Sequence, residues 1–534
     1  MGQIHLLDCT LRDGGYLNDW NFGHSVLNET AQRLANAGID YIELGFLDDR
    51  RKEDINRSIF PRTECINKIY HHLDKKQSKL LAMIDYGTCD ISNIQPQQET
   101  IIDGIRVIFK KEKMDGAIAF CSQIKALGYE VFAQLVSTTV YEEDDFNHIA
   151  RLANELMPTA LSIVDTYGLM DEEELARIYQ ELDSRIDKKV ILGFHAHNNL
   201  QLGFSNAISF LTNRLKTDRV LVADGTLHGM GKGAGNAPIE SLAFYANKYV
   251  NGHYDINQLL EAIDSNILKL FGKNNWGYSM KFFLAATNRV HPNYLSDYIS
   301  SGVLSISDIN NILKNINEPK KLYYDKNESA RVFDDFKLAT QHLTDASIKA
   351  LDQEIKGRKV LLLGPGDTIV GERKAIDKYI KKEAPVIIAV NYLPHDYEID
   401  YLFITNSRRL CDIASKDLSS STKIISTSNL SPINKEFSFI VDYAMLTDNS
   451  AAKDSAIVMA LRLLCLTSIS TVALAGFDGY KSSFEESFVN ISNSYGWKEP
   501  YPGFLNSYIR NEIKQLSNKL DISFLTTSML EDED

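Results

Sequence analysis

Over about the first 250 of the chain's 534 residues, short apolar runs alternate with longer amphipathic stretches, and this alternation limits the possible folds most strongly. Eight runs have the length and composition of buried strands: 4–9, 41–45, 79–84, 105–109, 130–136, 160–164, 190–195 and 219–223. The stretches between them have helical spacing, as at 26–37, 114–127, 146–156 and 172–182. Eight β-then-α units in about 250 residues match a closed (β/α)8 TIM barrel better than an open sheet.

The rest of the chain predicts two further parts, because one hydrophobic core cannot serve a chain of this length. Residues 251–355 are mostly polar and helical in pattern, which indicates a helical extension and linker after a barrel at 1–250. A new alternation then begins, with strands expected at 360–364, 386–391, 401–406, 423–427, 437–441 and 471–476, and an apolar helix at 455–466. Residues 356–534 are therefore predicted to form a Rossmann-like α/β domain.

Composition limits the function and the partners. A net charge of -14 and a pI near 5.4 argue against binding to nucleic acid or to an anionic membrane. The six cysteines form no CxxC pair, and no apolar run approaches the roughly 18 residues of a membrane span. A strand expected from residue 4 leaves no room for a signal peptide. These features predict a cytoplasmic protein.

Three side chains predict a site for a divalent metal ion. Asp13 follows the first expected strand, beside Arg12, while His195 and His197 stand at i and i+2, on one face at the end of the seventh. Strands one and seven end at the same rim of a closed barrel. One carboxylate and two imidazoles leave coordination positions open, as a catalytic metal requires. The alternative is that each histidine is only hydrogen-bonded.

Several motifs in the same order resemble the superfamily of pyruvate-dependent aldolases and synthases, which includes 4-hydroxy-2-oxovalerate aldolase, isopropylmalate synthase and hydroxymethylglutaryl-CoA lyase. They are DCTLRDG at 8–14, IELG at 42–45, IRV at 105–107, HAHNN at 195–199 and DGTLHGMGKGAGNAP at 224–238. The resemblance covers residues 1 to about 350, and the last two motifs look closest to the hydroxy-oxovalerate aldolase branch. It implies that Asp13, His195 and His197, joined by Asn236, bind Mn²⁺ or Mg²⁺.

The resemblance also implies a reaction. A divalent-metal-dependent aldolase, a carbon–carbon lyase, would reversibly join pyruvate or another 2-oxo acid to an aldehyde through a metal-bound enolate. Arg12 would then stabilise the enolate oxygen and bind the substrate. One alternative is a Claisen-type synthase that condenses an acyl-CoA with a 2-oxo acid. Another is a nucleotide-sugar-binding, glycosyltransferase-like protein whose barrel is vestigial.

The general base is where the sequence departs from these aldolases, which carry a histidine three residues after the metal aspartate. Tyr16 stands there, and a free tyrosine has a pKa of about 10, which makes it a poor base. His228, in the loop after the eighth strand, is the alternative, unless it is simply exposed to water. At the same rim, Ser137, Asp165 and Gly233 are expected to contact substrate, although simple turn chemistry explains Ser137 and Asp165 equally well.

The predicted second domain carries a weaker signal. Gly364 and Gly366 follow a strand and precede a helix, where a turn can hold phosphate, and Asn391 ends the next strand. These turns are faintly similar to the CMP-sugar-binding sialyltransferase-like fold. They indicate a nucleotide-linked or phosphorylated partner, with a scaffold or a homo-oligomerisation domain as the alternative.

Overall fold

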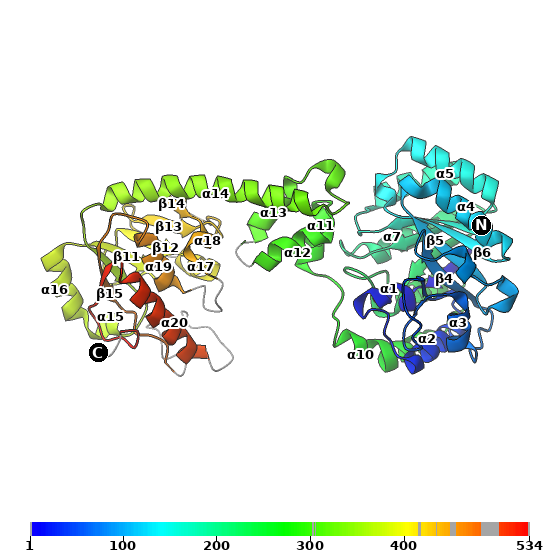
Figure 1. Ribbon diagram of the computed structural model, residues 1–534, viewed down its shortest axis with the longest axis horizontal. Coiled ribbons are helices and arrows are strands. Elements are labelled where there is room, and N and C mark those ends of the chain that lie inside the picture. Colours follow the sequence, from blue (N-terminus) through cyan, green and yellow to red (C-terminus); the bar gives the residue numbers. More distant parts are fainter. Residues whose placement is uncertain are drawn as a thin grey trace. The chain divides into compact units, whose positions relative to one another are not determined.

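The computed structural model describes residues 3–301, 304, 306–414, 418–433, 435–448, 455–481 and 501–531 (Figure 1). The chain forms two compact units, Met1–Pro292 and Asn293–Asp534. The predicted division at residues 250 and 355 stays a prediction.

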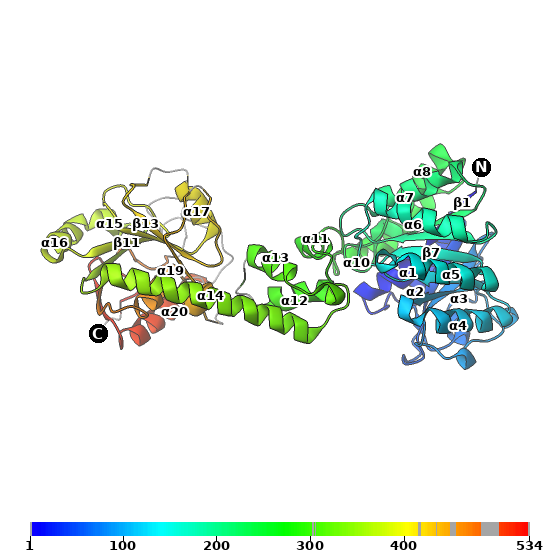
Figure 2. The ribbon, with the colours of Figure 1, turned by 90° about the horizontal axis from the view of Figure 1, so that it is seen from above.

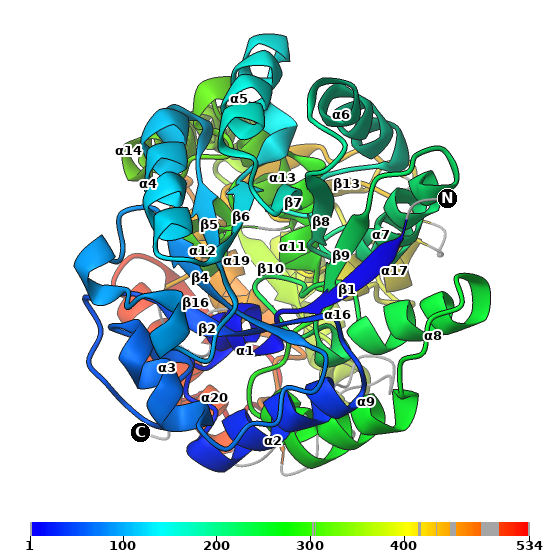
Figure 3. The same ribbon diagram turned by 90° about the vertical axis from the view of Figure 1, so that its right-hand side faces the viewer.

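The first unit contains the predicted barrel, which Figure 3 shows nearly end-on. Its eight parallel strands are β1 (Ile4–Asp8), β2 (Tyr41–Leu47), β4 (Lys79–Asp85), β5 (Gly104–Phe109), β6 (Glu130–Leu135), β7 (Ala160–Asp165), β8 (Ile191–Ala196) and β9 (Leu221–Gly225). Their order is β1-β9-β8-β7-β6-β5-β4-β2, and pairing of β1 with β2 closes the ring, which confirms the (β/α)8 prediction. A two-residue strand that was not predicted, β3 (Ile59–Phe60), pairs with β2.

Helices surround these strands, as the period of the intervening sequence predicts. They are α2 (His24–Asn36), α3 (Thr63–Tyr70), α4 (Met114–Ala126), α5 (Glu143–Leu156), α6 (Glu172–Arg185), α7 (Gly203–Thr212) and α8 (Ile239–Tyr249), while the four-residue α1 (Thr10–Asp13) lies at the carboxyl end of β1. The helical extension begins in the same unit with α9 (Ile256–Ala262), a π-helical stretch (Ile263–Ile267), α10 (Leu268–Phe271) and α11 (Met280–Thr287). No helix within the described ranges is both long and apolar enough to cross a membrane.

The barrel interior consists of two layers of side chains. The lower layer is apolar and forms one buried cluster, Leu7, Tyr41, Leu81, Phe132, Ala160 and Val222, which Cys9, two residues beyond Leu7, joins from above. Nearer the carboxyl ends of the strands, a layer of buried polar side chains replaces it: Glu43, Arg106, Gln134, Ser162 and Asp224. Four of these follow a member of the apolar cluster by two residues, so the strand period places them on the same inward face. This polar layer lies beneath the rim at which the candidate site is built.

The helix α12 (Pro292–Ser301) starts at the boundary between the two units, and α13 (Ile306–Lys314) and α14 (Lys326–Ile355) follow in the second unit. An open parallel sheet follows, made of β10 (Val360–Leu363), β11 (Val386–Val390), β12 (Tyr401–Ile404), β13 (Lys423–Thr427), β14 (Phe439–Val441), β15 (Thr471–Ala475) and β16 (Asp521–Phe524), in the order β14-β13-β12-β11-β10-β15-β16. The order reverses direction between β10 and β15, as in a doubly wound fold. The six strands expected from the sequence are present, but β16 was missed.

Successive residues of this sheet pack into two different cores. One core joins Leu362 to α14, α19 (Ala456–Leu464) and α20 (Tyr501–Leu516). The other joins Leu363 to α15 (Thr368–Gly371), α16 (Arg373–Glu383) and α17 (Ser407–Ala414). A further short helix, α18 (Tyr443–Leu446), follows β14. Helices thus cover both faces of the sheet (Figures 1 and 2), which confirms the Rossmann-like prediction.

Candidate metal site at the barrel rim

Arg12 and Asp13 lie at the rim because a tight turn follows the first strand. The Asp8 carboxylate accepts hydrogen bonds from the Thr10 backbone N–H (2.9 Å) and hydroxyl (2.8 Å), so the chain enters α1 directly after β1. Asp13 then meets His195, near the end of β8, and His197, just beyond it. One possible ligand atom from each of the three lies within 4.8 Å of the others, and all three side chains are buried. The structure thus brings together three of the predicted ligands from positions about 180 residues apart.

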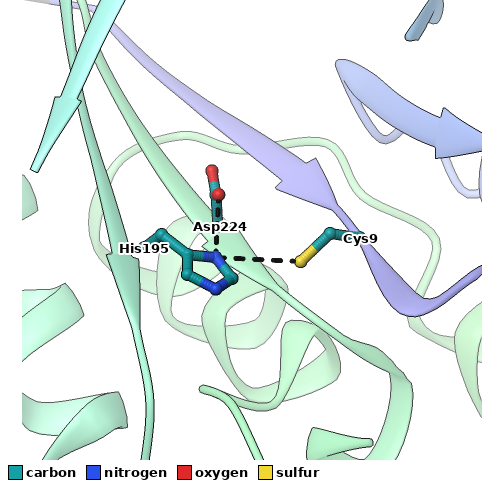
Figure 4. Close-up of side chains that lie close together, drawn as sticks. All are labelled: Cys9, His195 and Asp224. Carbon is teal, nitrogen blue, oxygen red and sulfur yellow. Dashed lines mark hydrogen bonds and ion pairs between the residues drawn. The ribbon is translucent and has the colours of Figure 1, made fainter. Parts of the chain in front are cut away.

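Figure 4 shows how His195 is oriented. Its Nδ1 lies 3.0 Å from Asp224 Oδ2 and 3.9 Å from Cys9 Sγ. A carboxylate at this distance holds the proton on Nδ1, so Nε2 is left as the nitrogen that can bind a cation. Cys9, His195 and Asp224 also lie close enough to form a second donor group. Burial, however, raises the pKa of the Cys9 thiol well above its usual range, so we assign this group to supporting His195.

A chain of buried charges continues beneath the site from Asp224. Arg106 bonds to Asp224 and to Gln134 Oε1 (2.9 Å), and its other terminal nitrogen lies 3.3 Å from Glu43 Oε2. The same Glu43 oxygen accepts a hydrogen bond from Arg12 Nε (2.7 Å), while Arg12 Nη1 donates to Asp13 Oδ1 (2.6 Å). One network therefore links Arg12 and Asp13 to the carboxylate behind His195.

This network sets the protonation of the ligand set. Burial alone would raise the pKa of Asp13, but the charge of Arg12, with smaller effects from the two histidines, holds it well below its usual range. Burial lowers the pKa of His197 to about 4, although Asp13 opposes the shift. At neutral pH the carboxylate is therefore ionised and the His197 imidazole is neutral, which are the forms that bind a divalent cation.

Asn236 and Gly231 complete the fit to a metal ion. The Asn236 amide nitrogen donates to Asp13 Oδ2, whereas its Oδ1 is buried and has no hydrogen-bond partner among the described residues. An amide oxygen left unpaired beside a carboxylate is suited to a cation. A Cβ at position 231 would lie 2.5 Å from Asp13 Oδ2 and 2.0 Å from the Asn236 amide nitrogen, so only glycine leaves this space open.

The two residues considered as general base have different surroundings. Tyr16 lies at the rim, 40% exposed, with its ring 4.8 Å from that of Trp20 and 5.4 Å from Lys232 Nζ, and desolvation by the surrounding protein raises its pKa to about 12. His228 adopts a left-handed backbone conformation (φ 53°), and its ring packs edge-to-face on Phe271 and Trp276. The structure thus gives Tyr16 a protonated phenol at neutral pH and places His228 in an aromatic cluster.

The rim residues expected to contact substrate have structural partners. Asp165 accepts backbone hydrogen bonds from Leu169 (2.8 Å) and Met170 (3.1 Å), and burial raises its pKa to about 7. Ser137 is buried in a left-handed conformation, and its N–H donates to Thr166 Oγ1 (2.8 Å). These bonds are the turn chemistry considered as the alternative for both residues.

Gly233 lies in a loop that Asn199 fastens to the site. Gly233 has a positive φ (72°), and a Cβ there would lie 3.0 Å from Asn199 Oδ1. That oxygen accepts a hydrogen bond from Ala234 N (3.0 Å), while the Asn199 amide donates to Tyr167 O (2.7 Å). Asn199 therefore ties the loop after β9 to the loop after β7.

In the second unit, the turn after β10 packs against the turn after β15. Gly364 N donates to Ala475 O (2.9 Å), and Gly366 N donates to Gly476 O (2.7 Å). The N-terminal N–H of α15, at Thr368, donates to the Asp478 carboxylate (3.0 Å), which takes the position where phosphate was expected.

Asn391 exchanges two 2.9 Å hydrogen bonds with Thr405. Nucleotide binding at Gly364, Gly366 and Asn391 stays a prediction.

Glu43, Arg106 and Asp224 were not among the site residues predicted from the sequence. Their signal was present, since each is a charged residue within an otherwise apolar strand. A charge at an inward position of a barrel must be paired, so such positions identify a buried network.

Comparisons with known proteins identify a family for residues 3–265. Residues 3–265 match the HMGL-like family model. An oxaloacetate decarboxylase of Mycobacterium tuberculosis is 25% identical over 294 residues, covering 52% of this chain and 81% of that protein. A 4-hydroxy-2-oxovalerate aldolase of Thermus thermophilus is 28% identical over 261 residues, covering 48% and 73%.

Among solved structures, a hydroxymethylglutaryl-CoA lyase from Pseudomonas aeruginosa aligns with a TM-score of 0.42 at 16% identity, covering 51% of this chain and 94% of that one. The barrel assignment rests on the strand order itself rather than on this alignment. The family match and the named relatives together show that residues 3–265 are an HMGL-like domain and that the protein is an enzyme of the lyase class.

Proposed function

We propose that the barrel is a divalent-metal-dependent aldolase that reversibly joins pyruvate, or a closely related 2-oxo acid, to an aldehyde. The observation that carries this proposal is the pairing of two features at one rim. Asp13, His195 and His197 converge as a three-ligand set, and the Arg12 guanidinium lies directly beside it. This combination suits a reaction in which negative charge develops on an oxygen of a small substrate.

Asp13, His195, His197 and Asn236 would hold the cation, and Mn²⁺ or Mg²⁺ suits their oxygen and nitrogen donors. When bound, the ion supplies a Lewis acid that withdraws charge from the carboxylate and keto oxygens of a 2-oxo acid. Asp224 keeps the proton of His195 on Nδ1. Arg106, in turn, holds Asp224 in place.

Arg12 would act on the oxygen that gains charge when the C–C bond breaks. Its Nε and Nη1 are engaged by Glu43 and Asp13, and Nη2 makes no hydrogen bond to any described residue. Two fixed nitrogens hold the guanidinium plane, so Nη2 can donate to the developing oxyanion without reorganising.

The relatives support a 2-oxo acid substrate. One is named for decarboxylation of oxaloacetate and another for aldol cleavage of 4-hydroxy-2-oxovalerate. Both reactions break a C–C bond and leave an electron pair beside the keto group of pyruvate. The second domain would bind a nucleotide or phosphate attached to the aldehyde.

Two measurements test the proposal without knowledge of the aldehyde. Mn²⁺ should bind to the purified protein, and the protein should then exchange the methyl protons of pyruvate in D₂O. His197→Ala should abolish both, whereas His253→Ala, at an exposed histidine, should change neither. Full Mn²⁺ occupancy in the double variant His195→Ala/His197→Ala would contradict the ligand assignment.

A further inference from the structure

A segment outside the eight β/α units covers part of the barrel rim. We call residues 276–291 the cap. Trp276 Nε1 donates to His228 O (2.9 Å), and a Cβ at Gly235 would lie 3.4 Å from the Trp276 ring. Phe282 lies 3.7 Å from the corresponding position at Gly233. These contacts place the cap over the loop after β9, which carries Asn236.

The cap ends at His291, which lies over the loop after β7. The rings of His291 and Tyr167 stand edge-to-face with centroids 5.5 Å apart. Nearby on the cap, Arg289 pairs with Glu174 of α6 (3.1 Å), which anchors this end of the segment. His291 is only partly exposed. The ring contact with Tyr167 and the Arg289–Glu174 ion pair place this end of the cap at the rim.

Two short links join His291's neighbours to the ligand set. The Tyr167 carbonyl accepts a hydrogen bond from Asn199, two residues after His197. In the opposing loop, the Lys232 backbone N–H lies 3.3 Å from Asp13 Oδ2. The loops beside His291 thus contact the candidate ligand set, through Asn199 in one case and Asp13 in the other.

Burial, with two nearby positive charges, keeps the His291 imidazole neutral at physiological pH. Burial, followed by the positive charges of Lys232 in the β9 loop and Lys110 after β5, lowers its pKa to about 4. Tyr167 from the β7 loop adds a ring but no charge, and the Arg289 charge on the cap is paired with Glu174. An anionic 2-oxo acid that binds beside these lysines would offset their repulsion and make the imidazole more basic.

We infer that His291 is the general base that accepts the proton of the C4 hydroxyl when a 4-hydroxy-2-oxo acid is cleaved. This inference rests on the proposed aldolase function. In the step, His291 takes the hydroxyl proton, the O–H electron pair forms the carbonyl of the departing aldehyde, and the C3–C4 bond breaks. Its electron pair remains on the pyruvate fragment, as the enolate. Of the two residues considered from the sequence, Tyr16 holds its proton too tightly and His228 is packed against Phe271 and Trp276.

A pair of reactions tests this role, because only one of them needs a hydroxyl proton to be removed. Cleavage of 4-hydroxy-2-oxopentanoate requires the base, whereas decarboxylation of oxaloacetate breaks an analogous bond in a substrate without that hydroxyl. With Mn²⁺ bound, His291→Gln should slow the cleavage by about 100- to 10,000-fold, the usual contribution of a general base. Decarboxylation and Mn²⁺ affinity should stay within about twofold of the wild type, as they should in the control His253→Gln.

A second variant separates catalysis from structure. His291→Ala should lose cleavage similarly, and added imidazole should restore part of the rate, which a merely structural role would not allow. Equal loss of both reactions, or unchanged cleavage in His291→Gln, would overturn the inference while leaving the metal-dependent function intact. A wild type that decarboxylates oxaloacetate but cleaves no 4-hydroxy-2-oxo acid would also overturn it. A wild type that neither binds Mn²⁺ nor exchanges pyruvate protons would instead refute the proposed function.

Discussion

Asp224→Asn is the substitution that most directly tests how the barrel interior supports its rim. The amide keeps the size of the side chain but removes a buried charge that contacts two partners, His195 Nδ1 and Arg106. Arg106 would keep only the more distant Glu43, which Arg12 already shares. Two properties should therefore change together, the metal affinity and the stability of the metal-free fold.

The structure sets the expected size of each change. Removing the carboxylate behind a ligating histidine lowers metal affinity by about 10- to 100-fold, or about 1.4–2.7 kcal/mol. Removing the sole partner of a buried arginine costs about 3–5 kcal/mol of unfolding free energy, and this is an upper bound here because Glu43 stays 3.3 Å from Arg106. Arg106 and Asp224 are each 1% exposed, so solvent would not compensate for the lost charge.

Two titrations measure these effects, Mn²⁺ binding by calorimetry and urea unfolding in EDTA. Asp165→Asn is a matched control, because Asp165 is also a buried acid at the end of a barrel strand but accepts only backbone hydrogen bonds. It should leave Mn²⁺ affinity unchanged. Unchanged Mn²⁺ affinity in Asp224→Asn would refute the reasoning, since His195 would then need no carboxylate to orient it.

The barrel could be predicted from the sequence because its signals are local. Eight apolar runs, each followed by a helical period, specify the β/α units, and His195 and His197 show their shared face through i,i+2 spacing. The strand β16 was not predicted because its four residues, which are at most partly buried, contain no apolar run. Its position comes from pairing with β15, which no short-range pattern encodes.

The support of the site was harder to predict for a similar reason. The link from Glu43 through Arg106 to Asp224 joins strands β2, β5 and β9, which meet only after the barrel closes. His228 itself has a left-handed backbone conformation, which turns its ring towards Phe271. Its position after β9 in the sequence therefore did not reveal its aromatic partners. His291 was not considered, because it follows the eight units and reaches the rim only through the fold of the cap.

Three further predictions concern the rim and its buried acids. Arg12→Lys keeps the charge but loses the planar fork, so kcat should fall by the equivalent of about 2–4 kcal/mol, whereas a change in KM alone would make Arg12 a binding residue. Gly231→Ala should weaken Mn²⁺ binding with little change in helix content by circular dichroism, because the new methyl group lies against Asp13 and Asn236. The last prediction concerns pH. Burial raises the pKa of Asp165 to about 7, above its value of about 3.8 when exposed, so the folded state binds the extra proton between these two values. Its contribution to stability is complete below about pH 4 and is lost as the pH rises towards 7. Urea unfolding at pH 5 and 7.5 should therefore show a smaller loss of stability in Asp165→Asn than in the wild type, and an equal loss in both would mean that the carboxyl stays ionised in the folded protein.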